Sequence, residues 1–148
     1  MIEKLGLLLI LVCATLSALH VPAGDSGVRF RALDVHVDAG AARLAAWQVE
    51  ISCDSPEAMI VGVEGGETKE YSEPPWYDPA ALQGGRIVLG AFTTAGSAPA
   101  GRTRVARIHV EEPAGIEPRY AGRIVAAAAP GGDRIEAKVE VQPTGGER

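Results

Sequence analysis

Few residues of this chain have the types and spacing that enzymatic chemistry requires. After residue 23 the only histidines are His36 and His109, and no Gly-x-Ser-x-Gly motif places a serine nucleophile on a strained turn. The one cysteine in that part, Cys53, lies in an alternating pattern that predicts a core residue rather than a reactive thiol. The sequence also lacks a phosphate loop, a dinucleotide fingerprint and zinc-ligand spacing. We therefore expect a protein that is not an enzyme and needs no cofactor.

Binding chemistry has a stronger candidate in residues 71–79, which read Tyr-Ser-Glu-Pro-Pro-Trp-Tyr-Asp-Pro. The two adjacent prolines stiffen the backbone, so an aromatic side chain presented there loses little entropy when it binds. Tryptophan and tyrosine also dominate the energetics of protein interfaces. Tyr71, Trp76 and Tyr77 are therefore candidate binding residues. The alternative is that Trp76 and Tyr77 fold back as a lid that anchors this loop to the core.

Four acidic residues accompany the aromatics and complete the candidate binding site: Glu67, Glu70, Glu73 and Asp78. Their carboxylates could hold Ca²⁺, although their spacing does not match a calcium loop. They belong to a wider asymmetry, because residues 50–78 carry eight acids and one lysine, whereas residues 79–110 carry four arginines and no acid. Either this asymmetry steers a partner of matching polarity, or the two segments neutralise each other across the fold. The net charge of −5 disfavours nucleic acid as a partner.

Strands must position these residues, because period-two alternation dominates the chain. A strand with one buried face is predicted where Trp47, Val49, Ile51 and Cys53 alternate with Gln48, Glu50, Ser52 and Asp54. This pattern places Trp47 in the core. Further strands are predicted over residues 28–37, 59–63, 86–92, 102–111, 122–129 and 134–142. In the first of them the apolar register switches between Phe30 and Leu33, which indicates a bulge or a crossing between sheets.

Helical signals are almost absent. Residues 78–84 combine an N-cap aspartate, a proline at the first helical position and a glycine at the stop, so they predict one or two helical turns. Many short strands with glycine and proline turns predict an all-β fold, an antiparallel β-sandwich. We expect a single domain over residues 24–148, with its core at about residues 28–142 and no intramolecular disulfide.

The first 23 residues indicate where the protein works. Lys4 precedes an apolar stretch over residues 5–19, and residues 21–23, Val-Pro-Ala, are suited to cleavage before Gly24. The pattern predicts a signal-peptide helix over residues 1–23 and an exported protein, periplasmic or extracellular. The alternative is an uncleaved membrane anchor, but the stretch is shorter than the roughly 20 residues that a spanning helix needs.

The order of the segments carries a family resemblance. The chain has an early Val-x-Val strand at Val35 and Val37, followed by the strand of residues 44–53. An Asp-Ser-Pro turn at residues 54–56 comes next, with Met59 behind it. A glycine then follows the apolar run that ends at Val63. Two further strands, residues 86–92 and 104–110, flank a glycine turn at Gly101. Over residues 30–141 this order resembles cohesin domains. The resemblance implies a jelly-roll or cohesin-like β-sandwich that binds other proteins, a shape that carbohydrate-binding modules share.

These observations together predict an exported, non-catalytic binding or scaffold domain. Its partner would be another protein, met at the cell envelope or outside the cell. A first alternative is a carbohydrate-binding module that stacks Trp76, Tyr77 and Tyr71 on the sugar rings of a polysaccharide. A second alternative is an accessory or inhibitor subunit of an enzyme. A membrane would be a partner only if the N-terminal segment is not cleaved.

Overall fold

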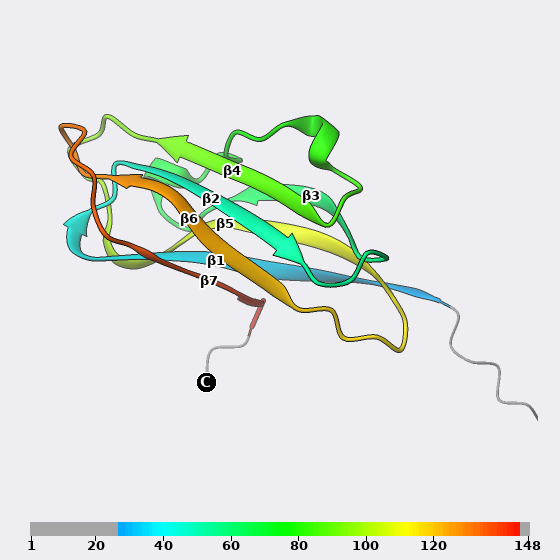
Figure 1. Cartoon of the computed structure of the whole chain (residues 1–148). Helices are drawn as coiled ribbons and strands as arrows, with labels where there is room; N and C mark the ends of the chain where they lie inside the picture. Colours follow the sequence, from blue (N-terminus) through cyan, green and yellow to red (C-terminus); the bar gives the residue numbers. More distant parts are fainter. Residues whose placement is uncertain (1–26, 146–148) are drawn as a thin grey trace, which may run out of the picture.

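The structure is a computed structural model that describes residues 27–145, and within that range the chain forms two antiparallel sheets (Figure 1). Sheet A has the strand order β3-β5-β1-β7, and sheet B has the order β4-β2-β6. The strands are β1 Val28–Arg43, β2 Ala46–Cys53, β3 Met59–Gly65, β4 Arg86–Phe92, β5 Ala100–Pro113, β6 Tyr120–Ala128 and β7 Lys138–Pro143. The prediction of an all-β antiparallel fold is confirmed. The predicted signal peptide, residues 1–23, lies outside the described residues.

The central strand of sheet B, β2, confirms the alternation expected from its sequence over residues 47–51, whereas Cys53 at its end is only partly buried and does not join the core as predicted. Trp47, Val49 and Ile51 are buried, whereas Gln48 between them is exposed. β4 pairs with one edge of β2 and β6 pairs with the other. Directly paired residues point to the same side of a sheet. The outer face of sheet B is therefore built from the residues of β4 and β6 that pair with Gln48 and its even-numbered neighbours.

The first strand differs from our prediction in one respect. β1 is continuous over 16 residues, and the apolar register does not switch between Phe30 and Leu33. Leu33 is buried, whereas Phe30 is 66% exposed on the outer face, so unbroken alternation relates the two residues. The register shift in the pairing with β5 lies further along, between Val35 and His36. There β5 carries one additional residue, Val105, as a bulge.

The inward positions at the start of β1 are polar because they serve a buried carboxylate, and this is why Phe30 faces outward. Glu112 of β5 is fully buried and accepts hydrogen bonds from Arg29 Nε (2.8 Å), Arg31 Nη2 (2.6 Å) and the Tyr120 hydroxyl (3.1 Å). Burial raises the pKa of Glu112, but these hydrogen bonds outweigh it and hold the pKa below its ordinary value. Alternation then leaves Phe30 on the solvent side.

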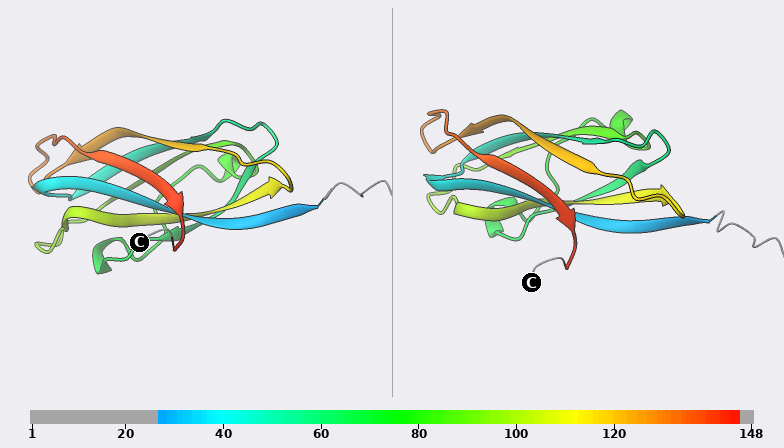
Figure 2. Two further views of the ribbon diagram at one scale, coloured as in Figure 1. Left: turned by 90° about the horizontal axis from the view of Figure 1, so that it is seen from below. Right: turned by 60° about the horizontal axis from the view of Figure 1, so that its bottom comes forward.

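The core lies between the two sheets and takes inward residues from both. Its fully buried aliphatic residues include Leu33, Val35, Val37, Ile108 and Val110 from sheet A, and Val49, Ile51, Ile87 and Leu89 from sheet B. Trp47 belongs to the same cluster and is 3% exposed, which confirms its predicted core position. Figure 2 shows the first part of β1 reaching past the end of β7, consistent with a pairing of β7 that begins only at Leu33.

The last strand is shorter than the sequence predicts. β7 covers Lys138–Pro143, whereas the alternation predicted a strand over residues 134–142. Arg134 instead forms an isolated bridge with β6, and the amide of Ile135 donates to the carbonyl of Ala127 in that strand (3.0 Å). β7 itself pairs with β1. The chain thus passes from sheet B to sheet A before β7 begins, which is why residues 134–137 are not part of β7.

The short helical turn predicted after residue 78 is present as the 3₁₀ helix η2, Pro79–Ala81. The Asp78 carboxylate caps it by accepting a hydrogen bond from the Ala80 amide (2.9 Å). A second 3₁₀ turn, η1, Lys69–Tyr71, was not predicted. Across residues 27–145 the structure contains no helix of sufficient length and apolar character to cross a membrane.

Candidate functional site

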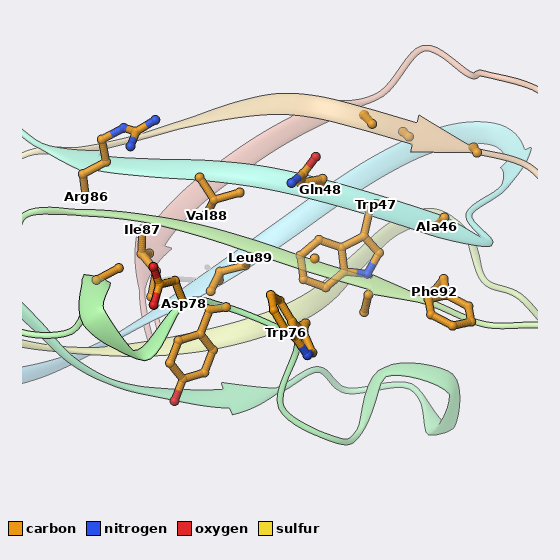
Figure 3. Close-up of a pocket in the computed structure, with 17 residues that line it drawn as sticks. Ala46, Trp47, Gln48, Trp76, Asp78, Arg86, Ile87, Val88, Leu89 and Phe92 are labelled. Atoms are coloured by element: carbon orange, nitrogen blue, oxygen red, sulfur yellow. The ribbon is translucent and has the colours of Figure 1, made fainter.

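A groove with a volume of about 640 Å³ opens on the outer face of sheet B, and we call it the sheet B groove. Its floor is formed by Ala46 and Gln48 of β2, Val88, Gly90 and Phe92 of β4, and Ala126 and Ala128 of β6. The segment that precedes and includes η2 borders it along the free edge of β4. Figure 3 shows Trp76 beside β4, Phe92 near the end of that strand, and Gln48 on β2.

Trp76 is held at this edge by backbone pairing. Its amide donates to the Gly90 carbonyl (2.7 Å), and the Gly90 amide donates to the Trp76 carbonyl (2.9 Å). Trp76 therefore extends sheet B by one residue and shares the outer face with Gly90. Because Gly90 has no side chain, β4 does not cover the indole at that position, and Trp76 is 84% exposed. The structure thus presents this candidate residue to solvent on a fixed backbone.

Phe92, which sequence reasoning did not select, is the second exposed aromatic of the groove, at 77% exposure. It lies two residues beyond Gly90, so it is the diagonal neighbour of Trp76 on the same face, within reach of an aromatic side chain. We did not predict an exposed Phe92 because we interpreted residues 86–92 as a buried strand. The alternation of the strand could have revealed it, since Ile87 and Leu89 face inward and Phe92, an odd number of residues away from both, must face outward.

The two tyrosines of the candidate site do not stand in solvent beside Trp76. Tyr71 is buried: its hydroxyl donates to the Leu44 carbonyl (2.7 Å), and its ring stands edge-on to Trp47 with centroids 6.0 Å apart. Burial, with a smaller contribution from Glu70, raises the pKa of Tyr71 to about 12. Tyr77 borders the groove but is half-buried and packs against the core. Tyr77 therefore folds back onto the core, as the lid alternative proposed, whereas the side chain of Trp76 does not and is accessible to a ligand.

The four acidic candidates are not gathered into one site. Glu67 accepts a hydrogen bond from the backbone amide of Arg104 in β5 (2.8 Å). Glu70 accepts one from the Ser97 hydroxyl, which lowers the pKa of Glu70. Glu73 is exposed, and Asp78 alone of the four lines the groove. In the part of the chain that the structure describes, no group of three or more His, Cys, Asp and Glu residues could hold a metal ion. The candidate Ca²⁺ ligands are thus not brought together.

A charged cluster lies at the Arg86 end of the groove. Glu50 of β2 accepts hydrogen bonds from Arg86 of β4 and from Arg123 of β6 (3.1 Å). The hydrogen bond from Arg86 is the main reason that the pKa of Glu50 lies below its ordinary value. Glu50 belongs to the acidic segment of the chain and Arg86 to the basic one. At this place the two segments neutralise each other.

The outer face of sheet A is of a different kind, because beyond the exposed Phe30 near the start of β1 it is covered by charged pairs. Arg107 Nε lies 2.7 Å from Asp34 Oδ1, and His109 Nε2 lies 2.7 Å from Glu64 Oε1. His36 is also on this sheet and is 6% exposed. Both histidines therefore lie on the sheet opposite the groove. The contrast between the two faces makes the sheet B groove the stronger candidate for a binding site.

Comparison with protein-family models, with curated proteins and with solved structures finds no match for this chain. The cohesin resemblance stays a prediction, and the function has to be argued from the groove.

Proposed function

We propose that the protein is an exported, non-catalytic binding domain, a β-sandwich of the cohesin type, that captures another protein on its sheet B groove. The observation that carries the proposal is the pair of aromatic side chains that stand in solvent beside small residues, Trp76 at 84% and Phe92 at 77% exposure. Exposed apolar patches rimmed by polar residues mark interaction sites on soluble proteins.

The construction of the groove suits an interface. Tryptophan is among the residues that most often act as binding anchors, and such anchors are effective when their neighbours exclude water. Gly90, Ala126 and Ala128 are small, which leaves recesses beside the two rings for side chains of a partner. Backbone pairing with Gly90 and the prolines before Trp76 fix its position, so little conformational entropy is lost on binding.

Export is supported by residues 1–23, whose charge, apolar stretch and small residues before Gly24 are those of a signal peptide. The partner would accordingly be met at the cell envelope or outside the cell. No catalytic role is proposed, because both histidines beyond residue 23 lie on sheet A and His109 is paired with Glu64.

A carbohydrate-binding module is the second candidate function. It is favoured by the two exposed rings on one face, since sugar rings stack on planar aromatic side chains. Two observations weigh against it. Tyr71 is buried and Tyr77 packs against the core, so the aromatic platform expected from the sequence is incomplete. Gln48 is the single polar side chain among the described residues of the groove floor, and the charged Asp78 and Arg86 lie toward one end, which leaves most sugar hydroxyls over the floor without a partner.

The proposal is tested by capture from the envelope fraction of the source organism on immobilised protein. The test variant carries Trp76→Ala and Phe92→Ala, and the matched control carries Glu140→Ala, on the outer face of sheet A. Wild type and control should capture the same partner, whereas the double variant should lose it with its thermal unfolding unchanged. Equal capture by all three proteins would contradict the assignment of the groove.

A further inference from the structure

We infer that the sheet B groove takes an extended, uncharged segment of the partner polypeptide, which runs along the strands and crosses Phe92; the inference rests on the proposed function. The groove does not end at Phe92. A second hollow of about 370 Å³ shares Ala46, Phe92 and Ala128 with the first and continues between the loops of residues 93–95 and 130–132. Phe92 therefore lines both hollows, which adjoin at these three residues and together make up the proposed path.

The path follows the strand direction, and its length fits an extended chain. The first hollow reaches back to Arg86 at the start of β4, and the second begins at Phe92, where β4 ends. The seven residues of β4 span roughly 20 Å at about 3.3 Å per residue. An extended peptide has the same rise, so six or seven of its residues would fill the first hollow and enter the second.

The charge of the lining indicates an uncharged ligand segment. Of the described residues that line the two hollows, the charged ones are Asp78 and Arg86, both toward the start of β4. From Gly90 onward the lining is uncharged and consists of alanine, glycine, threonine and proline residues together with Trp47, Gln48, Trp76 and Phe92. A charged ligand residue placed there would lose water without gaining a counter-charge. Near Asp78 and Arg86 a polar or charged residue can be accommodated, so the neutral stretch has a polar flank at that end.

Polar groups in the groove match a peptide better than a sugar chain. Gln48 lies at the centre of the floor, between Gly90 and Ala126, and is exposed. Its carboxamide can donate to a peptide carbonyl and accept from a peptide amide. A sugar ring presents several hydroxyls, whereas a peptide residue presents one donor and one acceptor and can turn apolar side chains toward Phe92 and Trp76.

The test uses a display library of random peptides of about twelve residues, selected on the purified protein, with an array of neutral glycans as a second arm. In the blocking variant, Ala126→Trp, the indole would fill the groove. The matched control is Ala121→Trp, because Ala121 is an exposed residue of the same strand that pairs with Ser52 beyond the groove. Melting curves followed by circular dichroism verify that both variants fold, and Gln48→Ala provides a milder second variant.

Selected peptides should share a stretch of about six uncharged, mostly apolar residues. Their affinity should fall by at least about tenfold in Ala126→Trp and severalfold in Gln48→Ala, while Ala121→Trp stays within about twofold of wild type. Peptides that bind all variants equally, a selection without groove-dependent peptides, or groove-dependent binding of neutral glycans would each overturn the inference. If envelope capture still depends on Trp76 and Phe92 in that case, the proposed function stands without this inference. If capture is independent of them, both fail.

Discussion

Replacing Trp47 by alanine should lower the free energy of unfolding by about 3–5 kcal/mol. The indole is 3% exposed, and a buried tryptophan removes about 150–250 Å² from water. At about 25 cal/mol per Å² this burial contributes about 4–6 kcal/mol. The native state already carries a cost, because Trp47 Nε1 is buried without a hydrogen-bond partner among residues 27–145. Such an unsatisfied donor costs about 1–3 kcal/mol, so removing it would by itself reduce the expected loss to about 1–5 kcal/mol. The cavity left by the indole adds to the loss, which places it in the upper part of that range.

The same reasoning separates two substitutions at this position. Trp47→Phe keeps an aromatic ring near Tyr71 and removes the unsatisfied N–H, so we expect it to cost about 1–2 kcal/mol, much less than the alanine variant. Urea denaturation followed by far-ultraviolet circular dichroism measures both, since this signal does not depend on the substituted tryptophan. A loss below about 1 kcal/mol in Trp47→Ala, or equal losses in the two variants, would refute the account of this part of the core.

Three other predictions concern stability and processing. Gly65→Ala would drive a Cβ into the Ser72 carbonyl oxygen, so it should cost about 1–3 kcal/mol in the same urea assay, whereas Gly96→Ala meets open space and should be nearly neutral; equal effects would contradict this. The folded-state pKa of Glu112 lies below its ordinary value, so its ionised form stabilises the fold above about pH 4.3 and that contribution disappears as the pH falls further. Glu112→Gln should therefore destabilise the protein at pH 7 by about 2–4 kcal/mol and show a smaller loss between pH 7 and pH 3 than wild type; an unchanged pH profile would show that Glu112 is not responsible. Intact-mass measurement of protein recovered from the source organism should give an N-terminus close to Gly24, and recovery of membrane-embedded protein that retains Met1 would favour an anchor.

Alternation along the chain predicted most of the fold, because a strand with one buried face has apolar and polar residues at alternate positions of its own sequence. Trp47, Val49 and Ile51 were placed inward from this alternation alone, and the structure agrees. The start of β1 misled us, since two arginines take inward positions there to pair with the buried Glu112, and a carboxylate 81 to 83 residues away leaves no local trace.

The candidate site was predicted only in part. The segment of residues 71–79 does present Trp76, but nothing local distinguishes it from Tyr71, whose burial depends on contacts with Trp47 and the Leu44 carbonyl. The groove floor was missed for a related reason. It joins β2, β4 and β6, and their order within the sheet decides which small residues become neighbours of Phe92.

The central claim, that a partner is held over Trp76, is tested most directly in the Trp47→Phe variant, where Trp76 is the sole tryptophan of the chain. Its fluorescence can be quenched by acrylamide with and without a saturating amount of the partner obtained by envelope capture. Because Trp76 is 84% exposed in the free protein, quenching should be efficient and should fall by about twofold or more when the partner covers the indole. Unchanged quenching at saturation would show that the partner binds elsewhere and that the sheet B groove is not the binding site.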